Sequence, residues 1–187
     1  MKGGINHLTD AYLDIETTGL SQFYDVITVI GIYLCNDIED KLIQLYGDQV
    51  TKDNLIAALQ DVHRIYTYNG RRFDIPFIAV FLGINLEAEF EHHDLMYRCW
   101  NYNLKGGFKA VERQLQIPRQ TEGITGFDAV RLWWKYQDSY DEDALNLLLQ
   151  YNKEDVINLK TLREKLAEYQ CWRENSHAKR FTDSKVL

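Results

Sequence analysis

The chain has 187 residues and a mass of 22.0 kDa, a size that fits a single domain. Hydrophobic residues make up 45% and charged residues 26% of it, near the globular average, which excludes a disordered or fibrous chain. The 28 acidic and 21 basic residues give a formal net charge of −7, which argues against a passive nucleic-acid-binding module. The same charge is compatible with an enzyme that reaches phosphate through metal ions, because such a site needs clustered carboxylates.

The sequence has no sign of a membrane segment or an oxidising compartment. No apolar run approaches the roughly 20 residues that span a bilayer, and the opening MKGGINH lacks the apolar segment of a secretory signal. Three widely spaced cysteines, Cys35, Cys99 and Cys171, form no CxxC pair and argue against a zinc ribbon. We therefore expect a cytoplasmic protein without a membrane partner.

The first half of the sequence alternates strand and helix signals. Alternating or β-branched apolar runs predict strands, Thr51 is a candidate N-cap, and Asn69-Gly70 favours a turn. Pro76 fits the first turn of a buried helix that Gly83 would end. The predicted strands cover residues 12–16, 26–34, 41–46 and 64–68, and the predicted helices cover 52–62 and 75–82.

The second half is expected to be mostly helical. A short strand is predicted at 92–96, helices at 108–115 and 127–136, and a long amphipathic helix at 142–169. The element order predicts one α/β domain over residues 1–170, with a mixed five-stranded sheet flanked by helices. After Cys171 the chain becomes polar and basic, so we expect residues 171–187 to form a mobile tail.

Two acidic residues are placed together on the first strand. Asp14 and Glu16 are two apart, so their side chains share one face, about 6–7 Å apart along the strand. Leu13 and Ile15 would point the other way, into apolar packing. Neighbouring carboxylates repel and lose hydration, which a fold tolerates if hard cations such as Mg²⁺ or Mn²⁺ lie between them. From the pair alone, a polar strand face at a sheet edge is as good an interpretation.

Two further acids strengthen the metal hypothesis. Asp74 follows the Asn69-Gly70 turn and lies at or just inside a helix start, where a helix N-cap is the alternative interpretation. Tyr151 and Asp155 are four apart on the long helix and face the same way, and a surface pair is the alternative. Glu154 is expected to point off that face and to be solvated.

Three motifs in chain order now carry a resemblance. DIETTGL at 14–20, NGRRFD at 69–74 and YNKED at 151–155 resemble the exonuclease motifs of the DnaQ-like superfamily. This superfamily comprises 3′→5′ exonucleases on a ribonuclease-H-like fold, called DEDD after their four carboxylates. HDLM at 93–96 and LKGGFKAVE at 104–112 resemble its predicted-exonuclease, ribonuclease-H-like branch. The resemblance covers residues 8 to about 166.

The last motif also indicates the subtype. The histidine subtype has its general base five residues before the final Asp, where this sequence has Gln150. The tyrosine subtype, which includes family-B polymerase proofreading domains, has a tyrosine four residues before it, which corresponds to Tyr151. The chain therefore resembles the tyrosine subtype, DEDDy.

The resemblance implies a two-metal hydrolysis of phosphodiester bonds at single-stranded DNA or RNA 3′ ends. It implies that Asp14 bridges the two Mg²⁺ or Mn²⁺ ions, that Glu16 and Asp155 complete the water-activating site, and that Asp74 holds the other ion. Tyr151 would orient the attacking water, since an ordinary phenol, with a pKa near 10, is a poor base. No other cofactor is implied.

Other residues and functions are weaker candidates. A strand-end role is expected for Asp94 rather than metal ligation by its neighbours His92 and His93, which have no zinc-like partner spacing. The motif DIETT loosely resembles the phosphatase motif DxDxT, but its second acid is Glu. The main alternative is a non-catalytic nucleic-acid-binding or scaffolding domain of the same fold, which the presence of all five motif residues disfavours. Five cations could line the strand path or lie on solvated surface: Arg71, Arg72, Lys105, Lys109 and Arg113. Five aromatics are expected in the core, with a base-stacking platform as the alternative for the last three: Phe73, Phe77, Trp133, Trp134 and Tyr136.

Overall fold

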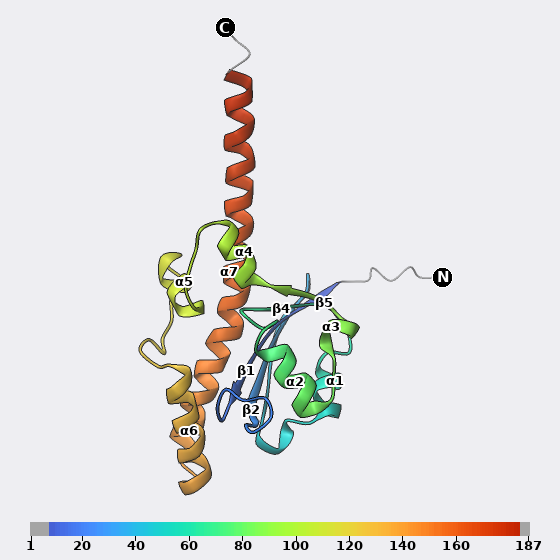
Figure 1. Ribbon diagram of the computed structural model, residues 1–187, viewed down its shortest axis with the longest axis vertical. Helices are drawn as coiled ribbons and strands as arrows, with labels where there is room; N and C mark the ends of the chain where they lie inside the picture. Colours follow the sequence, from blue (N-terminus) through green and yellow to red (C-terminus); the bar gives the residue numbers. More distant parts are fainter. Residues whose placement is uncertain (1–7, 184–187) are drawn as a thin grey trace, which may run out of the picture.

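The computed structural model describes the backbone of residues 8–183 and the side chains of residues 8–170. A five-stranded sheet in the order β3-β2-β1-β4-β5 lies at its centre (Figure 1). β1 pairs antiparallel with β2 and parallel with β4, so the sheet is mixed, as predicted. The strands are β1 (Thr9–Thr17), β2 (Ile27–Cys35), β3 (Asp40–Tyr46), β4 (Val62–Thr67) and β5 (Glu91–Asp94).

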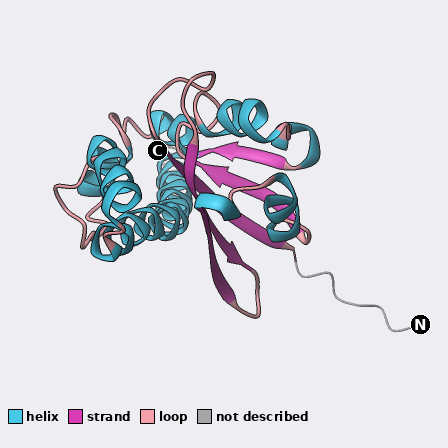
Figure 2. Cartoon of the chain, turned by 90° about the horizontal axis from the view of Figure 1, so that it is seen from below, coloured by secondary structure: helices cyan, strands magenta, loops and turns pink. Residues whose placement is uncertain are grey.

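Helices cover both faces of the sheet, as Figure 2 shows. One face packs against α1 (Lys52–Ala58), α2 (Asp74–Leu82) and α3 (Leu86–Glu89). The other packs against α4 (Leu95–Asn101), α5 (Phe108–Gln114), α6 (Gly126–Ser139) and α7 (Glu142–Asp183). Among the residues that the structure describes, none of the helices combines the length and the hydrophobicity that a membrane span requires.

Side-chain alternation along β1 divides the core into two layers. Leu13 and Ile15 are buried among residues of α1 and α2, whereas Tyr12 packs with α7 residues such as Leu159. Because successive strand residues point to opposite faces, Asp14 and Glu16 must lie on the α7 side. The predicted division of β1 into an apolar face and an acidic face is therefore confirmed.

Capping and turn residues in the sequence mark several of the observed helix ends. The Thr51 side chain caps α1 by accepting a hydrogen bond from Asn54 N, and Gly83, with φ of 68°, ends α2 in the left-handed region. The predicted helix over 52–62 was too long, because α1 ends at Ala58 and Val62 already begins β4. The short helices α3 and α4 were missed, since so few residues carry little helical periodicity.

The long helix also extends further than predicted. α7 continues to Asp183, whereas the apolar stripe predicted an end near residue 169. The proposed tail thus begins inside a helix, and the side chains that would explain this extension lie outside the described residues. The division into a domain over 1–170 and a tail over 171–187 stays a prediction.

Candidate active site

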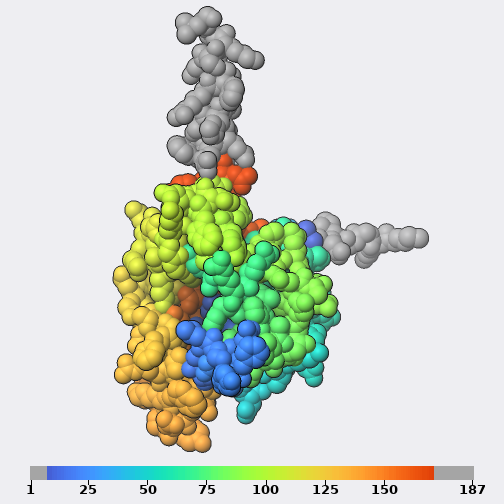
Figure 3. Space-filling model, in the orientation of Figure 1, coloured from blue at the N-terminus to red at the C-terminus, as the bar shows by residue number. Residues whose placement is uncertain are grey.

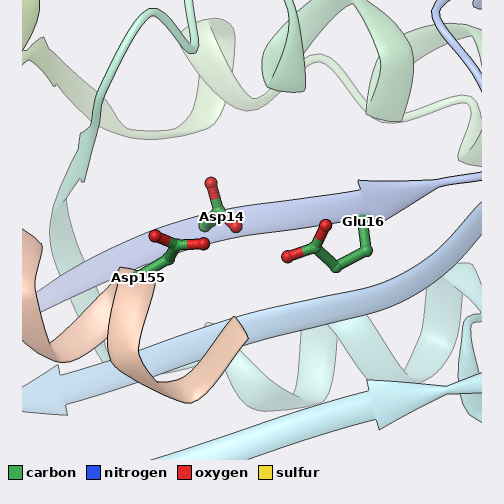
Figure 4. A group of neighbouring side chains, drawn as sticks. All are labelled: Asp14, Glu16 and Asp155. Carbon is green, nitrogen blue, oxygen red and sulfur yellow. The ribbon is translucent and has the colours of Figure 1, made fainter. Parts of the chain in front are cut away.

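Three carboxylates meet where α7 crosses β1. One ligand oxygen from each of Asp14, Glu16 and Asp155 lies within 4.8 Å of the others. Figure 4 shows the two β1 side chains and the α7 side chain directed into one shared space. Asp14 and Glu16 share one face of β1, and α7 crosses that face at Asp155. Residues up to 141 positions apart in the sequence therefore form one cluster.

The fourth predicted acid approaches this cluster from the other side of β1. Asp74 is the first residue of α2, and its Oδ1 accepts a hydrogen bond from the backbone N of Ile15 at 3.1 Å. Phe73 is the N-cap residue, so the alternative interpretation of Asp74 as an N-cap is wrong. Asp74 lies outside the three-carboxylate cluster but lines the same cavity.

A cavity of about 660 Å³ opens over these acids. Figure 3 shows the hollow, with parts of β1 and α7 visible at its base. The blue loop after β1 lies below it, the green segment before α2 to its right and the yellow-to-orange segments of α5 and α6 to its left. Its lining combines the site residues with apolar groups: Asp14, Glu16, Asp74, Tyr151 and Asp155; Leu20, Tyr68, Phe73, Phe127 and Val130.

Tyr151 is held by a lysine from α5. The Tyr151 hydroxyl accepts a hydrogen bond from Lys109 Nζ at 2.5 Å, and Lys109 Nζ also donates to the carbonyl of Ile124. Burial, and then the charges of Asp155 and Glu16, raise the pKa of Tyr151 above its usual range, so the phenol keeps its proton at neutral pH. Tyr151 can therefore orient a group by hydrogen bonding through its hydroxyl.

Arg119 is a site residue that the sequence did not indicate. Its guanidinium donates to both carboxylate oxygens of Glu112, at 3.0 and 2.7 Å, and to Asp155 Oδ1 at 2.5 Å. All three side chains are at least nine-tenths buried. Asn158 adds a hydrogen bond to Glu112, so this carboxylate is fully engaged. Arg119 supplies a fixed positive charge next to Asp155 of the carboxylate cluster.

Glu154 corrects one of our predictions. It is buried rather than solvated, and its carboxylate accepts hydrogen bonds from the backbone N of Gln120 and from both the backbone N and hydroxyl of Thr121. Gln150, where the histidine subtype has its base, donates to the same carboxylate. Glu154 therefore fastens the connection before α6 to α7, which in turn places Arg119.

Asn152 is a second unforeseen neighbour of the cluster. Its amide nitrogen donates to Asp14 Oδ2 at 3.3 Å, and its side-chain oxygen accepts from Gln44 Nε2 at 3.0 Å. The amide passes so close to β2 that a Cβ at Gly31 would lie 2.2 Å from Asn152 Oδ1. Gly31 pairs with Asp14 across the sheet, so only glycine at this position leaves room for the amide.

Mutual repulsion and burial perturb the acids. Burial raises the pKa of Asp74 to about 7 and that of Asp155 to about 6. Burial, followed by the charge of Asp155, also raises the pKa values of Asp14 and Glu16 well above their usual range. Clusters of acids with raised pKa values are characteristic of functional sites.

The residues fit a divalent cation. Glu16 Oε1 is buried and has no hydrogen-bond partner among the described residues, a costly state for a carboxylate oxygen. The cluster offers carboxylate oxygens from three residues, and all-oxygen donor sets suit Mg²⁺ or Mn²⁺. A cation bound here would satisfy the free oxygen and reduce the repulsion between the acids.

His92, His93 and Asp94, the weaker candidates from the sequence, all have hydrogen-bond partners in the structure. His92 is engaged by Glu87 and Thr67, and His93 by Glu91, with no metal-like grouping among the described residues. Asp94 caps α4 and also accepts hydrogen bonds from the backbone N of Asn69 and Arg71, which confirms its strand-end role.

The aromatic expectations hold in part. Trp133 and Phe77 are buried, and Tyr136 and Phe73 pack against the core. Trp134 was expected in the core but is 49% exposed. Phe73 also lines the cavity.

The fold and the acidic cluster agree with a family match. A model of the RNase_H superfamily matches residues 11–167, and the chain belongs to this superfamily. The predicted ribonuclease-H-like α/β fold is thereby confirmed.

One curated protein and several solved structures are similar to this chain at low sequence identity. The uncharacterized protein YprB of Bacillus subtilis (strain 168) is 25% identical over 194 residues, which cover 94% of this chain but 47% of YprB. The chain thus spans about half the length of this curated relative. Among solved structures, the family B DNA polymerase of Pyrobaculum calidifontis superposes with a TM-score of 0.65 at 16% identity, over 86% of this chain and 24% of the polymerase.

A second solved structure is more similar in length. Brucella melitensis NrnC with bound Mg²⁺ has a TM-score of 0.58 at 18% identity, covering 94% of this chain and 80% of NrnC. Another structure of that protein contains bound pGG. At these identities the likeness shows a shared fold.

Proposed function

We propose that this protein is a divalent-metal-dependent 3′→5′ exonuclease of the DEDDy type, acting on single-stranded DNA or RNA 3′ ends. The observation that carries the proposal is the cluster of Asp14, Glu16 and Asp155, in which one buried oxygen of Glu16 has no hydrogen-bond partner among the described residues. Asp74 and Tyr151 line the same cavity. These are the five residues that the motif resemblance selects.

Each side chain has a distinct role in this proposal. Asp14, Glu16, Asp74 and Asp155 would hold two Mg²⁺ or Mn²⁺ ions, with Asp14 shared between them. When bound, such ions supply water activation and stabilise charge on the attacked phosphate and the departing 3′ oxygen. Tyr151, protonated and fixed by Lys109, orients the attacking water through its hydroxyl. The fold relationship to Mg²⁺-bound NrnC is consistent with this metal choice.

The shape of the site favours a strand end as substrate. A single-stranded end can enter a cavity of about 660 Å³ directly, whereas a paired base must first be unstacked at a cost of a few kcal/mol. The apolar lining from Leu20 and Phe127 offers surfaces for the terminal bases. We also propose a cytoplasmic location, because Cys35 and Cys99 are free thiols of the kind a reducing compartment maintains.

The competing hypothesis is a non-catalytic domain that binds nucleic acid or scaffolds a complex. Such a domain has no need to keep three buried acids and the half-buried Asp14 around one cavity, since their repulsion destabilises the metal-free fold. The partnerless Glu16 oxygen would then be a cost without a function. We therefore favour the enzyme.

Hydrolysis of end-labelled oligonucleotides tests the proposal. We expect 5′-labelled single-stranded DNA or RNA to give a ladder shortening from the 3′ end with Mn²⁺ or Mg²⁺, and no products with EDTA. Asp14→Ala, purified in parallel, controls for contaminating nucleases. Cutting of circular single strands, or activity that survives EDTA, would contradict the proposal, and intact substrate under all conditions would favour the non-catalytic domain.

A further inference from the structure

An exposed rim borders the cavity where the segment before α2 meets α4 and the connection to α5. In Figure 3 the yellow-green segment around residues 95–105 lies directly above the hollow, next to the green segment before α2. Hydrogen bonds join the two segments: Asp94 accepts from the backbone N of Asn69, and the Tyr68 hydroxyl donates to the carbonyl of Gly106 at 2.7 Å. Because Tyr68 and Asn69 also line the cavity, the rim continues its wall.

The rim is basic on an otherwise acidic chain. Residues 68–73 contain two basic and no acidic residues, and residues 95–111 contain three basic and no acidic residues, although the whole chain has a net charge of −7. Arg71 is paired with Glu87, but no carboxylate of the described residues pairs with Arg72 or Lys105. Unpaired exposed cations beside a cavity attract phosphate.

Aromatic rings on α4 hold one of these cations in place. The guanidinium of Arg72 lies 5.9 Å from the ring centroid of Tyr97 and 5.8 Å from that of Trp100. Trp100 remains 43% exposed, so part of its ring stays available to a ligand. A fixed guanidinium beside an exposed indole offers one group for a phosphate and one for a stacked base, the combination that binds single strands without sequence preference.

We propose that the surface of Arg72, Tyr97, Trp100 and Lys105, here called the basic rim, binds the single strand on the 5′ side of the nucleotide being removed. This proposal rests on the proposed exonuclease function, which places the 3′ end in the cavity. The rim anchors the nucleotides that have not yet entered. It therefore contributes to the affinity for oligonucleotides and not to the hydrolytic step.

Two substrates of different length distinguish a contribution to oligonucleotide affinity from a contribution to the hydrolytic step. Thymidine 5′-(p-nitrophenyl phosphate) contains one phosphodiester and has p-nitrophenol in place of the upstream strand, whereas a single-stranded 10-mer reaches the rim. We expect Arg72→Ala/Trp100→Ala to raise KM for the 10-mer about 5-fold or more, with kcat and p-nitrophenyl ester hydrolysis unchanged. Arg72→Ala alone should also reduce the salt dependence, lowering the log–log slope by about 0.7 for one lost phosphate contact.

Matched variants control for general loss of charge or aromatic surface. Lys41 is exposed on β3, at the opposite edge of the sheet, and Tyr140 is 81% exposed after α6. Lys41→Ala/Tyr140→Ala should leave KM for the 10-mer unchanged. An unchanged KM in the rim variant, or an equal loss on both substrates, would overturn the proposal.

Direct binding distinguishes failure of the rim from failure of the proposed function. If the wild type hydrolyses neither substrate, the proposed function fails, and anisotropy of a fluorescent 10-mer in EDTA still tests the rim. Weaker binding by Arg72→Ala/Trp100→Ala than by the control variant supports the rim as a strand-binding surface. Equal binding by both variants and the wild type overturns it.

Discussion

Arg119 Nη2 donates a hydrogen bond to Asp155 Oδ1 at 2.5 Å. The same guanidinium also donates to both carboxylate oxygens of Glu112, through Nε and Nη2. One buried cation thus donates hydrogen bonds to two buried carboxylates, of which one belongs to the acidic cluster and the other does not. Glu112 is further bonded to Asn158 on α7, one turn beyond Asp155. The arrangement fixes the orientation of Asp155 before any metal binds and offsets part of the negative charge there.

We expect Arg119→Ala to be strongly destabilising. Removing one member of a buried charge network leaves Glu112 and Asp155 uncompensated, which typically costs about 3–5 kcal/mol. Arg119→Lys keeps the charge but loses the fork, so its unfolding free energy should lie between those of Arg119→Ala and the wild type. Chemical denaturation measures all three, with exposed Arg113→Ala on α5 as the control, expected within about 0.5 kcal/mol of the wild type. A similar loss in both Ala variants would contradict the network's importance.

The carboxylates and the tyrosine should differ in their effect on hydrolysis. Asp14→Ala and Asp155→Ala should each nearly abolish activity, because they remove metal ligands. Tyr151→Phe removes only the hydroxyl that Lys109 fixes, so a loss within the range of about 10²–10⁴-fold, typical of proton-transfer or orienting groups, is expected. Steady-state rates on the same oligonucleotide provide the comparison.

The outcomes for Tyr151 discriminate between roles. A loss as large as that of Asp14→Ala would mean that the phenol does more than orient water. No loss would put the DEDDy assignment in doubt. Tyr140→Phe, in an exposed position after α6, is the matched control and should be fully active.

Regular periods predicted parts of the acidic site, and the motif resemblance joined these parts to one another and to Asp74. A two-residue spacing on a strand put Asp14 beside Glu16, and a four-residue spacing on a helix put Tyr151 near Asp155. Because Leu13 and Ile15 are apolar and alternate with the two acids, the sequence predicted one apolar face and one acidic face for β1. The Asn69-Gly70 turn and the apolar helix that follows it predicted that Asp74 lies at the start of a helix.

Arg119 and Glu154 could not be placed in the same way. Arg119 lies in the irregular connection between α5 and α6, where no period relates it to Asp155, 36 positions away. Glu154 was expected to be solvated because helical spacing says which face a residue occupies, but not which loop covers that face. The backbone N–H groups of Gln120 and Thr121 that bury it belong to such a loop.

Gly31→Ala tests the close approach between β2 and α7. The new Cβ would lie 2.2 Å from Asn152 Oδ1, so the amide must move away from Asp14 and Gln44. We expect a loss of about 1–3 kcal/mol in stability, as for overpacked cores, together with reduced activity. Adding Asn152→Ala removes the clash, so the double variant should recover stability relative to Gly31→Ala. If it does not, the clash is not the cause.

The raised pKa values predict how the metal-free stability depends on pH. Folded Asp74, with a pKa of about 7, and Asp155, with a pKa of about 6, hold protons that the unfolded chain, near its ordinary value of about 3.9, has already lost. The unfolding free energy in EDTA should therefore fall as pH rises from about 4 through 7.

Urea unfolding at pH 5, 6, 7 and 8 measures this dependence. Asp74→Asn keeps an oxygen acceptor for Ile15 N but cannot ionise, so its stability should fall less across the same window. The difference between the two proteins isolates Asp74 from other titrating groups. Parallel curves for wild type and variant would refute a raised pKa at this site.

Metal binding should reverse the penalty of the clustered acids. A cation that binds only the folded site adds about 2.7 kcal/mol at 100 times its dissociation constant. For a domain of this size each kcal/mol shifts Tm by roughly 2–4 °C, so saturating Mn²⁺ should raise Tm by about 5–10 °C. The rise should shrink at pH 5, where the acids with raised pKa values are protonated and a cation must displace those protons.

Asp14→Ala is the decisive comparison for this prediction, because Asp14 is the proposed shared ligand and lies within the three-carboxylate cluster. Its metal-free Tm should equal or exceed that of the wild type, since one repelling charge is gone. Its rise with Mn²⁺ should be much smaller. Asp53→Ala, an exposed acid in the first turn of α1, controls for general effects of charge and should keep the full rise with Mn²⁺. Equal rises in wild type and Asp14→Ala would mean that the cation binds elsewhere, and the assignment of this cluster as a metal centre would be wrong.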